Sequence, residues 1–224
     1  MGEGAGRDDS RRPGGIRRAF GAILMILGIV AAAAAGLIVY SNYAEADAAF
    51  AAAQADALSL SAEIEADAAR TRDLGFVPDY VLDPTRDMPV VEVDGRRYVG
   101  IIEFPDLDRA LPVMESWSYD SLKIAPCRYN GTAYRAGFAI CAHNYARHFG
   151  QIKDLQTGNE IWFTDAAGNR FGYVVRMIET LQPTDTAKVV YSDWALTLFT
   201  CTLGGQARVT VRCDRLEGAT GFEF

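Results

Sequence analysis

Cysteine and histidine are scarce in this 224-residue chain, which contains four cysteines and two histidines. The cysteines, Cys127, Cys141, Cys201 and Cys213, form no Cys-x-x-Cys pair or zinc spacing, and they are too few and too scattered for a disulfide-scaffolded small domain. The sequence also lacks an acidic loop of the EF-hand type, and two histidines five residues apart do not make a metal site without further ligands. We therefore expect no metal site and no cofactor.

Charge of either sign is missing from residues 19–40, "AFGAILMILGIVAAAAAGLIVY", a run of 22 residues that is long enough to cross roughly 30 Å of hydrocarbon. Five arginines lie among residues 1–18, and no Lys or Arg follows the run until Arg70. The positive-inside rule therefore predicts a cytoplasmic N-terminus and an extracellular remainder. A signal peptide cleaved at a small-residue site such as Ala44-Glu45-Ala46 is the alternative, but signal-peptide apolar regions are shorter, about 7 to 15 residues, so we favour a retained single-pass anchor in the cell membrane.

Positive charge is also scarce outside the N-terminal tail. The formal charge of the chain is −7, and residues 1–18 carry five Arg and three acidic residues, so the remainder carries −9. Such an acidic surface repels a phosphate backbone, which excludes nucleic acid as an expected partner. No repeat of 20 to 50 residues is visible, which excludes solenoids and propellers.

Composition predicts five parts along the chain. They are a basic cytoplasmic tail (1–18), the membrane anchor (19–40), an Ala-rich helical stalk (41–73), a Pro-rich connecting segment (74–97) and a β-barrel domain (98–224). The stalk is rich in Ala, Glu, Asp and Leu, which is typical of a helix; a mobile spacer with fractional helicity is the alternative that its composition leaves open.

Short apolar runs separated by turn signals dominate the chain from residue 90 onward. The runs are VVEV, RYVGIIEF, FAICAH, EIWFT, RFGYVVRMIETL, ALTLFTC and RVTVRC, and turn signals include Asp94-Gly95 and Ala167-Gly168-Asn169. A short helix is expected near residues 146–154. This pattern predicts an all-β domain that forms a closed or nearly closed barrel.

The stretch "ALTLFTCTLGGQARVTVRCDR", residues 195–215, contains two strands joined by Gly204-Gly205. A hairpin-like return would bring Arg208, the first residue of the second strand, back to Cys201 at the end of the first. His143 follows another strand, FAICA, and is expected at a strand end as well. A free thiol with a pKa of about 8.5 is only a few per cent thiolate at neutral pH, so a nearby imidazole that takes its proton would activate it. Arg208 would stabilise an oxyanion, and the three residues together are the candidate catalytic group.

Two other basic residues compete for these roles. Arg212 lies on the same strand face as Arg208, and we favour Arg208 because it is nearer the cysteine end of the hairpin. His148 lies five residues after His143, and we expect it at the surface.

The remaining cysteines and aromatic residues have simpler expected roles. Cys127 and Cys213 are expected to be core thiols. Cys141 is expected to be a packing residue, or else a thiol that traps Cys201 as a disulfide under oxidation, and the sequence does not choose among the three complete disulfide pairings. The following aromatic residues are expected in the core or barrel wall, without a functional role: Trp117, Tyr119, Trp162 and Trp194.

Three of these segments resemble the signature of the sortases, the membrane-anchored cysteine transpeptidases of Gram-positive bacteria. They are TLFTC (197–201), AHN (142–144) and RVTVR (208–212). The TLxTC motif of that family ends in the nucleophile, the family's histidine follows an upstream strand, and its arginine begins the strand after the cysteine. Residues 99–114, VGIIEFPDLDRALPVM, are similar to the family's first barrel strands, so the resemblance covers about residues 98–216.

The resemblance implies an eight-stranded β-barrel with short helices, in which Cys201 is the nucleophile, His143 the general acid and base, and Arg208 the stabiliser of the oxyanion or substrate. It further implies that Cys201 attacks the Thr-Gly bond of an LPxTG-like sorting signal and forms a thioacyl enzyme. The implied partners are surface proteins or pilins that carry this signal, and an amine acceptor from a peptidoglycan precursor or a pilin lysine.

Two features bear on the subclass. Asp83-Pro84 is similar to the Asp-Pro-aromatic lid of pilin-building sortases, but Thr85 replaces the aromatic residue, so we favour a plain loop. The short stretch from Cys201 to Arg208 argues against the housekeeping class.

Two other functions compete with transpeptidation. One is a membrane-tethered β-barrel binding or assembly module whose cysteine and histidine are structural. The other is a cysteine hydrolase of cell-wall peptides, which shares the Cys-His pair but does not predict Arg208.

Overall fold

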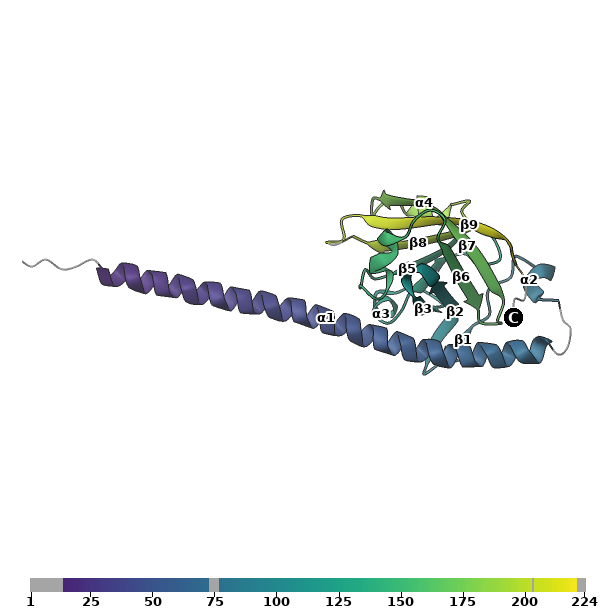
Figure 1. Ribbon diagram of the computed structural model, residues 1–224, viewed down its shortest axis with the longest axis horizontal. Helices are drawn as coiled ribbons and strands as arrows, with labels where there is room; N and C mark the ends of the chain where they lie inside the picture. Colours follow the sequence, from purple (N-terminus) through teal and green to yellow (C-terminus); the bar gives the residue numbers. More distant parts are fainter. Residues whose placement is uncertain (1–13, 73–76, 203, 221–224) are drawn as a thin grey trace, which may run out of the picture. The chain divides into compact units, whose positions relative to one another are not determined.

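The computed structural model describes residues 14–72, 77–202 and 204–220, and the chain divides into two compact units, residues 1–45 and 46–224. The helices are α1 (Gly14–Arg72), α2 (Asp79–Leu82), α3 (Tyr119–Leu122) and α4 (Thr186–Val190), with 3₁₀-helices η1 (Pro105–Leu107) and η2 (Phe149–Asp154). The strands are β1 (Val91–Val93), β2 (Arg96–Phe104), β3 (Arg109–Met114), β4 (Cys127–Asn130), β5 (Phe138–Ala142), β6 (Glu160–Asp165), β7 (Arg170–Leu181), β8 (Leu196–Cys201) and β9 (Arg208–Thr220). Figure 1 labels the α-helices and most of the strands.

The first unit contains the apolar part of α1. Its large apolar side chains from Phe20 to Val39 are exposed. Within the described residues, the helical stretch Phe20–Arg70 contains an 18-residue window of mean hydropathy 2.8, none of it buried. This helix is long and apolar enough to cross a membrane, and it includes the anchor expected at residues 19–40.

The second unit includes the C-terminal part of α1, which continues as a helix to Arg72. Ala53, Leu60 and Ile64 lie on one helical face because they are seven and four residues apart, and all three are buried. They belong to one apolar cluster with Tyr98 and Ile101 of β2. The expected stalk is therefore helical, and its C-terminal part packs on the barrel domain, a contact that composition alone did not indicate.

A buried carboxylate also joins this helix to the barrel. Asp56, which is 4% exposed, accepts a hydrogen bond from the hydroxyl of Tyr98 and one of 2.8 Å from Nη1 of Arg96. Burial is the main cause that raises the pKa of Tyr98, and the hydrogen bond to Asp56 raises it further. The tyrosine therefore remains a neutral donor to the carboxylate.

Replacing Asp56 with alanine is expected to lower the free energy of unfolding by about 2 kcal/mol, because the hydroxyl of Tyr98 loses its acceptor in a buried site. A larger loss is not expected, since the side chain of Arg96 is 35% exposed and can be solvated. Thermal unfolding of the full chain in detergent measures the effect. Asp47→Ala on the same helix is the control, since Asp47 is 69% exposed and its ion pair with Arg147 is 3.7 Å long. Equal stability of the two variants would contradict the prediction.

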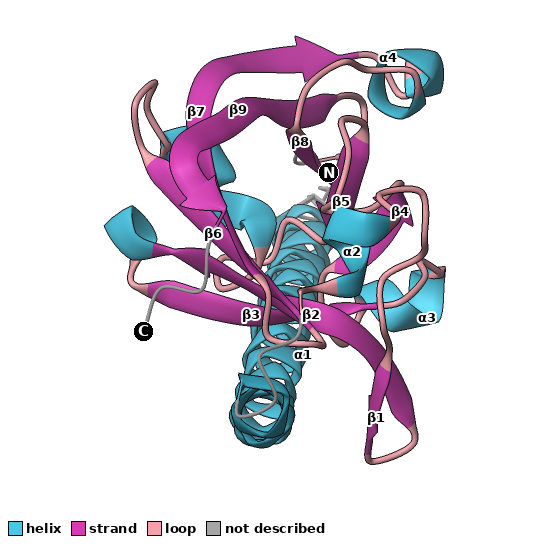
Figure 2. Cartoon of the chain, turned by 90° about the vertical axis from the view of Figure 1, so that its right-hand side faces the viewer, coloured by secondary structure: helices cyan, strands magenta, loops and turns pink. Residues whose placement is uncertain are grey.

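Eight strands form a closed barrel in the order β2-β3-β4-β5-β8-β9-β7-β6, and β6 pairs back onto β2. The pairs β3–β4 and β5–β8 are parallel and the others are antiparallel. β1 extends the sheet from β2 outside the closed ring. Figure 2 shows the strands curving around a common interior. The predicted eight-stranded, all-β barrel is confirmed.

Closure of the barrel depends on a close approach at Gly100. This residue of β2 pairs with Asp165 of β6 at a φ of 153°, and a Cβ atom there would lie 2.1 Å from the carbonyl oxygen of Thr164. Only glycine allows the two backbones to approach this closely.

Apolar side chains fill the interior, as is usual for a barrel of eight strands. The large side chains that are fully buried in the barrel interior include Phe104, Phe138, Phe163, Phe171 and Tyr173. The first hairpin, formed by β1 and the start of β2, lies in the range 74–97 that was expected to connect the stalk to the domain. The interior is lined by apolar side chains, and the candidate catalytic residues lie at the ends of strands.

Candidate active site

The ends of β5 and β8 lie next to each other. The two strands are parallel with Ala142 opposite Thr200, and Oγ1 of Thr200 donates a hydrogen bond of 2.8 Å to the carbonyl oxygen of Ala142. His143 directly follows β5, and Cys201 is the last residue of β8. Since neighbouring strands lie about 4.8 Å apart, this register brings the imidazole and the thiol to the same end of the barrel wall.

The hairpin between β8 and β9 brings an arginine to the same place. Cys201 pairs with Arg208 in the antiparallel register. The turn is closed by a hydrogen bond of 2.9 Å from the backbone N–H of Thr202 to the carbonyl of Ala207, and Gly204 and Gly205 have φ values of 83° and 71°. A positive φ at two successive positions is a conformation that favours glycine in hairpin turns. The turn returns Arg208 to Cys201, as the sequence predicted.

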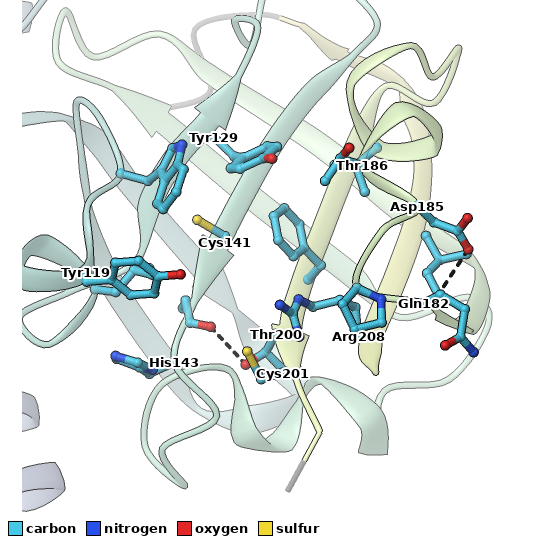
Figure 3. Close-up of a pocket in the computed structure, with 17 residues that line it drawn as sticks. Tyr119, Tyr129, Cys141, His143, Gln182, Asp185, Thr186, Thr200, Cys201 and Arg208 are labelled. Atoms are coloured by element: carbon cyan, nitrogen blue, oxygen red, sulfur yellow. Dashed lines mark hydrogen bonds between the residues drawn. The ribbon is translucent and has the colours of Figure 1, made fainter. Parts of the chain in front are cut away.

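His143, Cys201 and Arg208 line one cavity of about 240 Å³ (Figure 3). One wall comes from the β3–β4 connection, β4 and β8, and is apolar and aromatic: Trp117, Tyr119, Leu122, Tyr129 and Phe199. The opposite wall comes from the end of β7 and the connection to β8: Leu181, Gln182, Pro183, Asp185, Thr186 and Val189. The cavity is therefore a two-sided pocket with the thiol between its walls.

Cys201 differs from the other cysteines in its accessibility. All four cysteines lie in the described part of the chain and are free thiols, and Cys201 alone is not buried. Burial raises the pKa of Cys127 to about 12 and also raises the pKa values of Cys141 and Cys213. These three thiols keep their protons at neutral pH, as expected for the core thiols Cys127 and Cys213, and Cys201 is the thiol that a substrate can reach.

The strand register does not fit a disulfide between Cys141 and Cys201. Cys141 pairs with Phe199, two residues before Cys201. A diagonal of this kind separates Cα atoms by about 8 Å, whereas a disulfide needs roughly 4.4–6.8 Å. The packing role expected for Cys141 fits its burial at 5% exposure.

The structure distinguishes the two candidate arginines. Arg208 is partly exposed and lines the pocket, and its Nη1 donates hydrogen bonds of 3.2 Å to the carbonyls of Gly205 and Ala207. Arg212 is 3% exposed and is held by Glu179 at 2.8 Å and by the hydroxyl of Thr197 at 3.1 Å. Arg212 therefore has a structural ion pair, and Arg208 is the arginine that faces the pocket.

His148 is not at the surface, so that expectation was wrong. The loop after β5 turns back on itself through a hydrogen bond of 3.0 Å from the N–H of Gly150 to the carbonyl of Tyr145, and His148 is left 1% exposed. Burial, with smaller contributions from His143 and Arg109, lowers the pKa of His148 to about 4. The ring of Tyr145 lies 4.9 Å from that of His143 and 5.4 Å from that of His148. His148 is consequently neutral at physiological pH.

The expectation of core positions was also wrong for two aromatic residues. Trp117 is 44% exposed and Tyr119 is 76% exposed, because both lie in the connection between β3 and β4, and not in a strand. Trp162 and Trp194 are partly buried. Sequence reasoning thus missed one wall of the pocket, although the short spacing of Trp117, Tyr119 and Leu122 in the sequence was a usable signal.

The Asp83-Pro84 segment forms a local turn. Asp83 accepts hydrogen bonds from the N–H of Thr85 at 2.9 Å and from its hydroxyl at 2.6 Å, and these bonds lower the pKa of Asp83. Neither Asp83 nor Pro84 is among the described residues that line the Cys201 pocket. Within the described part of the chain, no group of three or more His, Cys, Asp or Glu side chains is arranged to hold a metal ion.

Comparison with known protein families identifies the domain. The family model described as "Sortase domain" matches residues 102–216, slightly more than half of the chain. This chain belongs to the sortase family. Sortases are cysteine transpeptidases, and the matched region of this sortase contains His143, Cys201 and Arg208.

Solved structures share the fold of this sortase. Sortase C1 of pilus island 1 from group B Streptococcus is 15% identical, with 77% of this chain and 96% of that chain covered and a TM-score of 0.55. A sortase C of Streptococcus pneumoniae is 20% identical, with coverage of 72% and 92% and a TM-score of 0.52. The sortase D5 transpeptidase of Clostridium perfringens is 17% identical, with coverage of 74% and 99% and a TM-score of 0.53. The comparison with curated proteins finds no match.

Proposed function

We propose that this sortase is a membrane-anchored transpeptidase that joins a protein carrying an LPxTG-like sorting signal to an amine acceptor through a thioacyl intermediate on Cys201. The donors are surface proteins or pilins, and the acceptor is an amine of a peptidoglycan precursor or a pilin lysine. The observation that carries the proposal is that His143, Cys201 and Arg208 line one pocket of a sortase domain.

Each of the three residues has a distinct role in the proposed first step. The thiolate of Cys201 attacks the carbonyl carbon between Thr and Gly of the signal, and a C–S bond forms. Arg208 stabilises the oxyanion that develops on the carbonyl oxygen. The C–N bond then breaks, and His143 gives a proton to the leaving amine.

The second step reverses the first with a new amine. The acceptor attacks the thioester carbonyl, His143 takes a proton from the attacking nitrogen, and the thiolate of Cys201 leaves. One amide bond is exchanged for another, and no ATP is needed because the thioester keeps the acyl group reactive. Shielding the thioester from water favours aminolysis over hydrolysis.

The proposed location follows from the anchor. The apolar part of α1 would span the membrane once, with the basic residues 1–18 in the cytoplasm and the barrel domain outside. The boundaries proposed for the parts are 1–18 for the tail, 19–40 for the anchor, 41–73 for the stalk, 74–97 for the connection and 98–224 for the catalytic barrel. This orientation places the thiol on the side of the membrane where exported proteins and cell-wall precursors are found.

Intact mass spectrometry of the full chain in detergent tests the proposal. The protein is incubated with a small panel of LPxTG-like peptides, first without and then with an added amine. We expect an acyl adduct on the protein that disappears as an amine-linked product forms. Adducts released only as the free acid at every amine concentration would indicate a hydrolase. No adduct with any peptide, together with alkylation of Cys201 as slow as that of the buried thiols, would favour a binding module.

A further inference from the structure

We propose that the aromatic wall of the pocket is the subsite for the acceptor, and that it selects a primary amine carried on an aliphatic stem. This wall, called here the aromatic arm, consists of Trp117, Tyr119, Tyr129 and Phe199. The inference rests on the proposed function, and it gives that function a recognition site for its second substrate.

The position of His143 determines the side from which the amine approaches. The same imidazole protonates the leaving amine and deprotonates the incoming one, so both nitrogens occupy the side of the thioester that faces His143. In Figure 3, Tyr119 and His143 lie on one side of Cys201, and Arg208, Gln182 and Asp185 lie on the other. The acyl half of the substrate therefore belongs on the Arg208 side, and the amine belongs on the side of Tyr119, which is part of the aromatic arm.

The rings of the arm form a continuous series in which each ring lies close to the next. The ring centroids are 6.0 Å apart for Trp117 and Tyr119, 5.7 Å for Trp117 and Tyr129, and 5.0 Å for Tyr129 and Phe199. Ser118 caps α3 by accepting a hydrogen bond of 2.9 Å from the N–H of Ser121, which fixes the start of the helix where Tyr119 lies. The rings of the arm thus pack against one another and line the pocket.

The chemistry of the arm suits an amine on a hydrocarbon stem. None of the four described residues that define it carries a formal charge, whereas Asp185 and Arg208 lie on the opposite side. Aromatic faces pack against methylene groups and attract an ammonium ion. Apolar surroundings also lower the pKa of an amine, which increases the neutral fraction that can attack a thioester.

The spacing of the arm from Cys201 sets the length of the stem. Phe199 lies two residues before Cys201 on the same face of β8, a separation of about 6.6 Å along a strand. The four-carbon stem of a lysine side chain is about as long, so its nitrogen can reach the thioester while its methylenes contact Phe199 and Tyr129. The amine of a glycine unit has no stem that can make this contact.

A second cavity adjoins the arm and leaves room for the rest of the acceptor. It measures about 420 Å³ and shares Trp117 and Tyr129 with the first. Its polar lining includes Arg86, Arg128 and Arg135. An acceptor whose lysine side chain enters along the arm can place its peptide backbone in this polar cavity.

Partition of the acyl enzyme tests the inference in the full chain in detergent. The donor is a peptide that acylates the wild type, and the acceptors are Nα-acetyl-lysine amide and glycinamide. Trp117→Ala and Tyr119→Ala are expected to raise the lysine-amide concentration needed for half-maximal transfer by about tenfold. The ratio of transfer to lysine amide over transfer to glycinamide should fall by about the same factor, because the amine of glycinamide has no stem that contacts the arm. Tyr119→Phe, which keeps the ring, should retain the lysine preference.

The matched control is Tyr191→Ala, since Tyr191 is 87% exposed and is not among the described residues that line the pocket. Unchanged transfer to lysine amide in both arm variants would overturn the inference and leave the proposed function intact. Slower acylation with an unchanged ratio of amide to acid product would also overturn it, because the arm would then bind the donor. Failure of the wild type to acylate with any donor would overturn the proposed function itself, and the inference with it.

Discussion

Replacing Cys201 with alanine is expected to abolish the acyl enzyme, with transfer reduced by at least about 10³-fold. Among the described residues that line the pocket, the other thiol is Cys141, and burial raises its pKa, so it keeps its proton and does not replace Cys201. The variant and the wild type are compared by intact mass with the same donor and acceptor. Cys213→Ala is the control, since that thiol lies in the barrel interior and does not line the pocket.

Alkylation is an independent test of the role of Cys201. Brief treatment of the native wild type with iodoacetamide should label Cys201 and leave the three buried cysteines unmodified, since an exposed thiol forms the reactive thiolate more readily than a buried one. An adduct of normal yield on Cys201→Ala would show that another group is the nucleophile. Equal and slow labelling of all four thiols would show that Cys201 is not accessible in the way the pocket suggests.

The C-terminal hairpin could be predicted from the sequence because its signals are local. The apolar alternation before Cys201, the Gly204-Gly205 pair and the alternation after Arg208 specify two strands and a turn, and the register that opposes Cys201 to Arg208 follows from them. The same pattern favoured Arg208 over Arg212 as the arginine beside Cys201, because Arg208 is nearer the turn. Arg208 lines the pocket in the structure. Local patterns thus predicted that Cys201 and Arg208, two of the three candidate residues, face each other across the hairpin.

The placement of His143 beside Cys201 needed more than local pattern. It depends on the parallel pairing of β5 with β8, whose paired residues are 58 positions apart in the chain. Nothing in the composition of either strand specifies that partner, so the sequence predicted two strand ends but not their adjacency. The adjacency was suggested by the family resemblance alone, and the structure shows it directly.

Short or interrupted strands were not predicted from the alternation of apolar residues. The run Arg109–Met114 that forms β3 contains Pro112, and β4, Cys127–Asn130, has four residues with little alternation.

The packing of the stalk helix on the barrel was equally hard to predict. Leu58 and Leu60 are two residues apart in the stalk, yet Leu58 is 72% exposed and Leu60 is buried. Small residues such as Ala53 contribute to the packed face without giving a strong apolar signal.

Replacing His143 with glutamine is expected to slow both acylation and aminolysis by about 10²- to 10⁴-fold, because each step moves a proton that the amide side chain cannot carry. Glutamine keeps the polarity and approximate size of the side chain, so the fold should be unaffected. Single-turnover acylation and transfer to a lysine-type acceptor, each measured from pH 5 to 10, give the two rates separately. The variant should also lose the wild type's pH dependence that arises from the imidazole.

His148→Phe is the matched control, because His148 is the other histidine of the chain and does not line the pocket. Burial lowers the pKa of His148 to about 4, below the ordinary value of about 6.5, so His148 is neutral throughout the assay range above about pH 5. The unfolded chain binds a proton at His148 more readily than the folded chain, so this residue adds stability above about pH 6.5 that is lost as the pH falls toward 4. The control should therefore keep the wild-type pH profile of activity and lose less stability in acid. A rate loss in His148→Phe as large as in His143→Gln would mean that the proton passes through both imidazoles, and the assignment of general acid and base to His143 alone would fail.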